Sequence, residues 1–384
     1  MLHGLMTTTF AKVFRKPAGL VLLLAFCLFF APHPASGGDF TPVTGPCRLA
    51  FPRDHAAHPG YRIEWWYYTG DLESKTGERF GFQLTFFRVR TTADESRWPE
   101  PRSAWRTDQV FAAHAAVSDF STGRFLTAET MYRAALGLAG TTAAGNEFRV
   151  FTGGWHAEIT PGAHRLAASA PDFSFDLQLV PEKPPVPHGD SGYTRKGEAD
   201  DEASCYYSIT RLRTSGKLRA GGKEMDVCGT AWMDHEFSSA PPDAELSGWD
   251  WFSLRLSDGR DLMLYLMRKK DGSLSPVSSG TLVDGSGKSS NLSFEDFRVT
   301  TLDTWKSPHT GAVYPAARLI EVFPAGLRLQ IEPEMRDQEV QSPRSTRVTY
   351  WEGGVSAKGT AAGAGPVSGQ GYMELTGYAG DVNF

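Results

Sequence analysis

Short stretches in which apolar and polar residues alternate run through most of the chain. Phe80, Phe82, Leu84 and Phe86 fall on one face of an extended segment, because successive side chains of a strand point to opposite sides. The segment at residues 262–267 is apolar on both faces, which is typical of a strand that is buried on both sides. This pattern predicts an all-β protein.

One hairpin pattern occurs twice. In residues 65–88 and again in residues 249–268, an aromatic-rich strand, a turn and an apolar strand follow one another, and the last residue is arginine. Two such copies indicate the duplication of a whole domain, with Trp66 and Trp251 at equivalent positions. Two β-barrels are predicted, because closing a sheet removes its exposed edges, and a pair of open sandwiches is the alternative.

The first residues have the pattern of an export signal. Lys12, Arg15 and Lys16 precede an apolar run at residues 18–31, and a cleavage site among small residues is expected within residues 35–39. We therefore expect a periplasmic or secreted protein that does not span the membrane after cleavage. An uncleaved N-terminal membrane anchor is the alternative.

The expected organisation has three parts. A signal peptide occupies residues 1–37, an N-terminal domain residues 38–238 and a C-terminal domain residues 239–384, with a linker beginning at the Ser- and Pro-containing stretch 238–243. The 384 residues are enough for two domains that each have a core.

Composition narrows the class further. The chain contains 40 Gly and 24 Pro, which suits short strands joined by tight turns, and a short helix is expected only over residues 128–138. The net charge of -5 argues against nucleic-acid binding, which needs a basic surface. Cys205 and Cys228 lie in neighbouring predicted strands, where either a disulfide or two buried thiols would fit.

Three ionisable side chains follow one another at the end of a predicted strand: Asp234, His235 and Glu236. These candidate catalytic residues suit general acid/base chemistry, because burial shifts their pKa values toward neutrality. Strand alternation sends His235 to the side opposite its neighbours, so the triplet is a poor metal site. Neither a metal nor a cofactor is expected. The alternative role is a linker anchored by hydrogen bonds.

Carboxylates also lie between aromatic residues in both hairpin copies. Such a pattern is found in protein cores, and also in apolar ligand cavities that contain a few polar groups. The candidate ligand-binding residues are Glu64, Trp65, Trp66, Tyr67, Trp232, Trp249, Asp250 and Trp251.

Several longer motifs resemble one family, the carotenoid 1,2-hydratase/AttH-like proteins, over essentially the whole chain after the signal. The motifs are HPGYRIEWWYYTG (58–70), HAAVSD (114–119), ASCYYSITR (203–211), WMDHEFS (232–238), GWDWF (248–252) and GYMELTGY (371–378). The resemblance implies two tandem lipocalin-like β-barrel domains. It also implies that Asp234 takes the place of an aspartate that protonates an alkene, although Trp232 replaces the tyrosine of the family's Tyr-x-Asp segment.

These observations lead to three functional hypotheses. The first is an exported protein that binds an apolar or amphipathic small molecule, with hydratase or hydrolase activity left open. The second is a hydro-lyase that adds water to an isoprenoid C=C bond, and the third is a non-catalytic accessory of an ABC-type permease, both suggested by the resemblance. In the first two, Asp234 is expected at a cavity near the domain junction, without a basic partner and close to the tryptophans.

Overall fold

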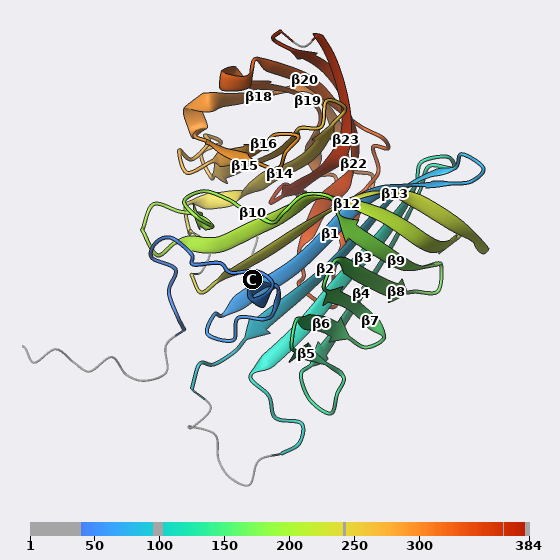
Figure 1. Cartoon of the computed structure of the whole chain (residues 1–384), viewed down its shortest axis with the longest axis vertical. Helices are drawn as coiled ribbons and strands as arrows, with labels where there is room; N and C mark the ends of the chain where they lie inside the picture. Colours follow the sequence, from blue (N-terminus) through green and yellow to red (C-terminus); the bar gives the residue numbers. More distant parts are fainter. Residues whose placement is uncertain (1–39, 95–102, 241–242, 364, 381–384) are drawn as a thin grey trace, which may run out of the picture. The chain divides into compact units, whose positions relative to one another are not determined.

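A computed structural model describes residues 40–94, 103–240, 243–363 and 365–380 (Figure 1). The predicted export signal lies outside the described residues. The described residues form one compact unit. The described residues contain three short 3-10 helices, η1 (Arg53–His55), η3 (Phe294–Asp296) and η4 (Phe323–Ala325), and no α-helix. None of their helices is long and apolar enough to cross a membrane.

The N-terminal half is a 13-stranded antiparallel sheet that curls into a nearly closed barrel. Its main path runs β4-β3-β2-β1-β13-β12-β9-β8-β7-β6-β5, and β10 and β11 pair with β12. The strands are β1 (Ile63–Ser74), β2 (Arg79–Arg90), β3 (Gln109–Asp119), β4 (Arg124–Arg133), β5 (Ala139–Ala144), β6 (Glu147–Thr152), β7 (Trp155–Thr160), β8 (Ala163–Ser169), β9 (Phe173–Pro181), β10 (Val186–Pro187), β11 (Tyr193–Arg195), β12 (Ala203–Ala220) and β13 (Lys223–Ser238).

The C-terminal half is a 10-stranded sheet that forms a half-barrel. Its main path runs β17-β16-β15-β14-β23-β22-β20-β19-β18, and β21 pairs with β22. The strands are β14 (Leu246–Leu256), β15 (Asp261–Lys269), β16 (Ser279–Val283), β17 (Ser289–Leu292), β18 (Phe297–Lys306), β19 (Val313–Val322), β20 (Leu327–Pro333), β21 (Glu339–Gln341), β22 (Thr349–Ala361) and β23 (Gly365–Thr376).

The two halves share one strand order over nine strands, and β5 and β6 have no counterpart in the C-terminal half. The predicted all-β fold with two related barrel-like halves is confirmed. In each half the first strand pairs with the second and with the last, as β1 does with β2 and β13, and β14 with β15 and β23. The blue-to-green and the yellow-to-red parts of Figure 1 follow these paths.

The predicted equivalence of Trp66 and Trp251 is wrong. Trp66 lies in the core of the N-terminal sheet, whereas Trp251 lies in an aromatic cluster where the two sheets meet. Side chains alternate along a strand, and Trp66 follows Glu64 by two residues while Trp251 follows Asp250 directly. The residue equivalent to Trp251 is therefore Trp65, because each of them directly follows the carboxylate of its hairpin, Asp250 and Glu64.

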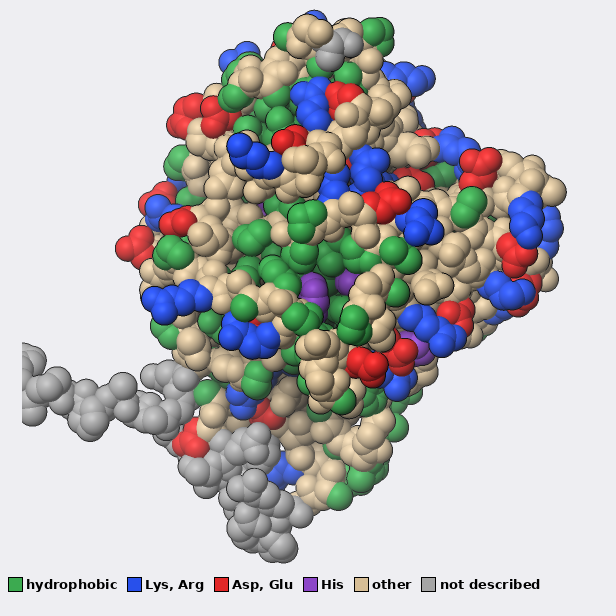
Figure 2. Space-filling model, in the orientation of Figure 1, with side chains coloured by type: hydrophobic (Ala, Val, Ile, Leu, Met, Phe, Trp, Pro, Cys, Tyr) green, Lys and Arg blue, Asp and Glu red, His purple; other side chains and the backbone are tan. Residues whose placement is uncertain are grey.

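Each sheet encloses its own hydrophobic core, and a third cluster joins them. This third cluster contains buried aromatic and methionine residues from both halves. Ion pairs also cross between the halves, including Arg255 with Asp71 and Arg79 with Glu334 at 2.7 Å. Hydrophobic side chains also gather in the middle of the face shown in Figure 2, with histidine side chains among them.

Two local predictions are corrected by the structure. Residues 124–133 form β4 and not part of a helix, because backbone pairing with β3 outweighs the helix propensity of the alanines. Cys205 forms a disulfide with Cys47, while Cys228 is an exposed free thiol. The β12–β13 register explains the error, because it places Cys228 opposite Ser215 rather than opposite Cys205.

Candidate functional site

A cavity of about 580 Å³ lies between the two sheets and is lined by residues of both halves. Its volume is that of a typical small-molecule pocket. Apolar and aromatic side chains make up much of the wall. Five carboxyl groups and two lysines also line it: Asp234, Glu236, Asp243, Glu352, Glu374, Lys196 and Lys270. The cavity therefore combines an apolar interior with a small number of ionisable groups.

Strand alternation in β13 decides which predicted residues reach this cavity. Asp234 and Glu236 line it, and Trp232 is fully buried behind it in the aromatic cluster. His235 points to the opposite side, as expected from the period of two along a strand. The predicted catalytic triplet is therefore divided between the cavity and the core of the N-terminal sheet.

Asp234 is held by three hydrogen-bond donors and has no ion-pair partner among the described residues. Trp232 Nε1 donates to Oδ1 at 2.6 Å, the Tyr206 hydroxyl donates to Oδ2 at 2.8 Å, and the Ser208 hydroxyl also donates to Oδ1. Burial raises the pKa of Asp234 from 3.8 to about 7, because the desolvation of the charge outweighs these donors. Near neutral pH this group is able both to give and to accept a proton.

A hydrogen-bonded chain extends from Asp234 away from the cavity. Ser208 Oγ contacts His188 Nε2 at 2.6 Å, and His188 Nδ1 contacts the hydroxyl of Thr281 at 2.8 Å. Burial lowers the pKa of His188 to about 3, so the imidazole is neutral and fixes the chain with one donor and one acceptor nitrogen. The chain orients Ser208 and through it the carboxyl group of Asp234.

Glu236 is neutralised by Lys196. The Lys196 Nζ lies 3.0 Å from Glu236 Oε1, and it also lies 5.1 Å from the ring centre of Tyr206 and 4.4 Å from that of Tyr265. These contacts combine an ion pair with cation–π attraction. No lysine, arginine or histidine among the described residues forms an ion pair with Asp234, Glu352 or Glu374.

The predicted aromatic residues form part of the cavity wall. Trp65, Tyr67, Trp249 and Trp251 all line it. The rings of Tyr67 and Trp251 meet edge to face at 5.2 Å, and Trp251 Nε1 donates to the Tyr206 hydroxyl at 3.0 Å. These contacts fix the orientation of the wall, since aromatic pairs prefer such edge-to-face packing.

Glu64 and Trp66 do not reach the cavity. Glu64 is fully buried on the other side of β1, where it accepts a hydrogen bond from Arg88 Nε at 2.9 Å and contacts His58 Nδ1 at 2.7 Å and His235 Nε2 at 2.8 Å. Burial alone would raise the pKa of Glu64, but the hydrogen bonds from His235 and His58 and the charge of Arg88 hold it well below its usual range. Glu64 is thus the ionised centre of a polar network.

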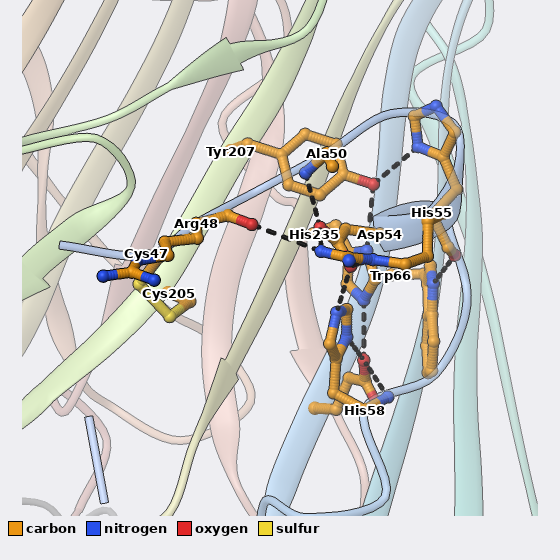
Figure 3. Close-up of polar contacts among 12 residues, drawn as sticks. Cys47, Arg48, Ala50, Asp54, His55, His58, Trp66, Cys205, Tyr207 and His235 are labelled. Atoms are coloured by element: carbon orange, nitrogen blue, oxygen red, sulfur yellow. Dashed lines mark hydrogen bonds and ion pairs between the residues drawn. A yellow bond between two sulfur atoms is a disulfide. The ribbon is translucent and has the colours of Figure 1, made fainter.

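The network continues through histidine and tyrosine side chains. His235 Nδ1 contacts the Tyr207 hydroxyl at 2.9 Å, and this hydroxyl contacts His55 Nδ1 at 2.7 Å (Figure 3). Ligand atoms of His58, Glu64 and His235 lie within 4.8 Å of one another. Because Arg88 already supplies a positive charge to Glu64, this cluster is neutralised by the protein itself.

Asp250 is also outside the cavity. It is buried in the C-terminal sheet, where it pairs with Arg268 Nε at 2.9 Å and with Arg318, and it accepts a hydrogen bond from Tyr378 at 2.9 Å. Asp250 and Arg268 thus repeat, in the second half, the pairing of Glu64 with Arg88. Both carboxylates hold together the strands that carry the cavity tryptophans on their opposite faces.

The ionisable residues of the cavity that are not among the candidates from the sequence include Lys196, Glu352 and Glu374. Glu374 lies inside the motif at residues 371–378, one of those that carry the family resemblance, so this motif could have identified Glu374 as a candidate site residue. Glu352 directly follows Tyr350 and Trp351, so it also has the pattern of a carboxylate beside aromatic residues, and Lys196 lies just after the short strand β11. Only the pairing of strands distant in sequence brings these groups together.

The fold and the cavity define an all-β protein with two related barrel-like halves and an acid-containing, aromatic-lined site between them. The profile of the family described as AttH-like matches residues 42–378, and the chain therefore belongs to the AttH-like family. A search of the curated proteins finds no match.

Solved structures share this fold. A Nitrosomonas europaea protein described as an AttH is 37% identical, with a TM-score of 0.77 over 88% of this chain and 100% of that chain. Kievitone hydratase from Nectria haematococca is 14% identical, with a TM-score of 0.65 over 90% of this chain and 97% of that chain. The structure of CghA with Sch210972 is 12% identical, with a TM-score of 0.53 over 91% of this chain and 99% of that chain.

Proposed function

We propose that the protein binds an apolar or amphipathic small molecule in the cavity between its sheets and hydrates a C=C bond of that molecule, with Asp234 as the acid. The observation that carries this proposal is the environment of Asp234. Its carboxyl group is buried, lines an aromatic-walled cavity, and has no basic partner among the described residues. An acid that protonates a weakly basic alkene must start in its protonated form, and burial provides this.

The chemical step follows from this geometry. The Asp234 O–H proton moves to one alkene carbon, and the π electrons form the new C–H bond while the other carbon becomes positive. The faces of nearby aromatic rings stabilise that charge. Water then forms the C–O bond and returns a proton to the Asp234 carboxylate, so the net change is the addition of one water molecule. The Ser208 or Tyr206 hydroxyl turns from donor to acceptor when Asp234 is protonated, whereas Trp232 only donates.

Similar folds support the reaction class. Kievitone hydratase, whose name states a hydration, has the same fold as this chain. This support is an analogy between folds, and the local support is the cavity with its raised-pKa acid.

We also infer that the protein works in the periplasm or after secretion. The disulfide between Cys47 and Cys205 is typical of proteins in an oxidising compartment, which agrees with the export signal expected from the first residues.

The proposed reaction is tested by isotope labelling. Small molecules that co-purify with the protein are identified by mass spectrometry, and isoprenoid and phenolic alkenes chosen to match them are incubated with the protein in ¹⁸O-labelled water. We expect a product that contains one added water with the label in its hydroxyl group. Asp234→Asn should bind the apolar probe Nile red as the wild type does and form no product, whereas Glu332→Gln on the exposed face of β20 should keep activity.

Three results would contradict the proposal. Turnover that survives in Asp234→Asn removes this residue from the acid role. If neither Nile red nor any alkene binds, the cavity is not a ligand site. Unfolding of Asp234→Asn, measured by circular dichroism, would assign the residue to the scaffold.

A further inference from the structure

Two glutamates face each other on neighbouring strands at one part of the cavity. Glu352 on β22 is directly opposite Glu374 on β23, and both line the cavity. Neither has an ion-pair partner among the described residues. Like charges directly opposite each other in a sheet are destabilising, so this pair is unfavourable unless something compensates it.

Hydrogen-bond acceptors without donors lie at the same place. Gln83 Nε2 donates to Glu352 Oε2 at 2.6 Å and to the Tyr350 hydroxyl at 3.2 Å, which leaves Gln83 Oε1 as a free acceptor. Glu352 Oε1 is also buried and has no hydrogen-bond partner among the described residues. The Tyr67 hydroxyl lies near this carboxylate and offsets part of the rise in its pKa, but it does not complete a hydrogen bond. Buried acceptors of this kind are costly unless a donor reaches them.

The two lysines that line the cavity do not meet this need, because Lys270 is exposed and forms no ion pair with either glutamate. Lys196 is paired with Glu236, and Glu374 Oε1 receives only neutral donors, Trp249 Nε1 at 3.0 Å and the Thr376 hydroxyl at 2.8 Å. What is missing is therefore a group that carries both N–H donors and a positive charge.

We propose that this part of the cavity binds the protonated amine of an amphipathic ligand, with its ammonium group between Glu352, Glu374 and Gln83 and its apolar part along Tyr67 and Trp251. This inference rests on the proposed function, because it takes the cavity to be the ligand site. The aromatic rings favour an organic cation over a strongly hydrated metal ion, since a weakly hydrated cation is attracted to ring faces at low desolvation cost. Ammonium donors to carboxylates form charge-assisted hydrogen bonds, which are stronger than neutral ones.

The protonation of the two glutamates agrees with this assignment. Burial raises the pKa of Glu352 well above its usual range, and the nearby charge of Glu374 adds a smaller rise. Burial raises the pKa of Glu374 to about 7. A bound cation would stabilise both ionised forms.

The test compares three probes of equal chain length at pH 7 by isothermal titration calorimetry: octylamine, octanol and octanoate. We expect octylamine to bind the wild type at least about tenfold more tightly than octanol, and octanoate to bind more weakly than octanol. The double variant Glu352→Gln/Glu374→Gln should bind octylamine and octanol equally, while its octanol affinity stays within about twofold of wild type. Glu332→Gln, which removes an exposed acid of the same half, should keep the full preference.

The outcomes separate this inference from the proposed function. Equal affinity for octanol and octylamine in the wild type would overturn the inference and leave the ligand site intact. A preference for the amine that survives in the double variant would also overturn it, because the cation would then bind elsewhere. Failure of all three probes to bind would remove the ligand site itself. Urea unfolding checks that the double variant is folded, which we expect because it removes a repulsive pair.

Discussion

Replacing Glu64 by glutamine should destabilise the fold strongly and leave the cavity chemistry unchanged. The substitution keeps the size of the side chain and removes its charge. Arg88, whose side chain is 1% exposed, would then be a buried cation without its counter-charge. Removing one partner of a buried ion pair costs about 3–5 kcal/mol, which is a large part of the stability of a typical domain.

The measurement is urea unfolding at pH 7, followed by circular dichroism. Glu64→Gln should lower the free energy of unfolding by about 3–5 kcal/mol, and the exposed Glu332→Gln by less than about 0.5 kcal/mol. Nile red should still bind to the folded variant, because Glu64 points away from the cavity.

A double-mutant cycle separates the ion pair from simple packing. Glu64→Gln combined with Arg88→Met should cost clearly less than the sum of the two single variants, because the unpaired charge is gone. A loss below about 1 kcal/mol for Glu64→Gln, or additive losses in the double variant, would refute the reasoning.

Three further outcomes are expected. Because burial raises the pKa of Asp234 from 3.8 to about 7, its stabilising effect is complete below pH 3.8 and is lost as the pH rises through 7. Between pH 5 and pH 8 the free energy of unfolding of the wild type should therefore fall by about 3 kcal/mol more than that of Asp234→Asn, as measured by urea unfolding. A difference that does not vary with pH would contradict this. Cys47→Ser removes a cross-link between residues 158 apart in sequence and should lower the free energy of unfolding by about 2–5 kcal/mol, and an unchanged urea midpoint would count against it. N-terminal sequencing of exported protein should begin within residues 35–39, and an intact Met1 would show that no signal is cleaved.

The strands and their faces could be predicted from the sequence because they depend on local periodicity. The alternation around Asp234 was enough to expect His235 on the opposite side, and the duplicated hairpin was enough to expect two related halves. The short helix expected over residues 128–138 does not form, because residues 124–133 pair with β3 and this long-range pairing overrides the local preference.

The composition of the cavity could not be predicted in the same way. Glu352 and Glu374 meet Asp234 only because β22, β23 and β13, which are far apart in sequence, border one space. The partner of Cys205 was missed for a related reason, because Cys47 lies before the first strand in a segment without a periodic pattern. Ion pairs such as Asp250 with Arg318 likewise depend on strand registers that a single sequence does not fix.

The proposed acid role depends on Asp234 being a buried carboxyl group that is protonated near neutral pH and faces the cavity. Infrared difference spectroscopy of the wild type against Asp234→Asn measures this protonation, because a protonated carboxyl group has a C=O stretch that a carboxylate lacks. We expect the wild type to show such a band at pH 6, the band to disappear with a midpoint near pH 7, and Asp234→Asn to lack it. A wild-type spectrum in which Asp234 is already ionised at pH 6 would contradict the acid role.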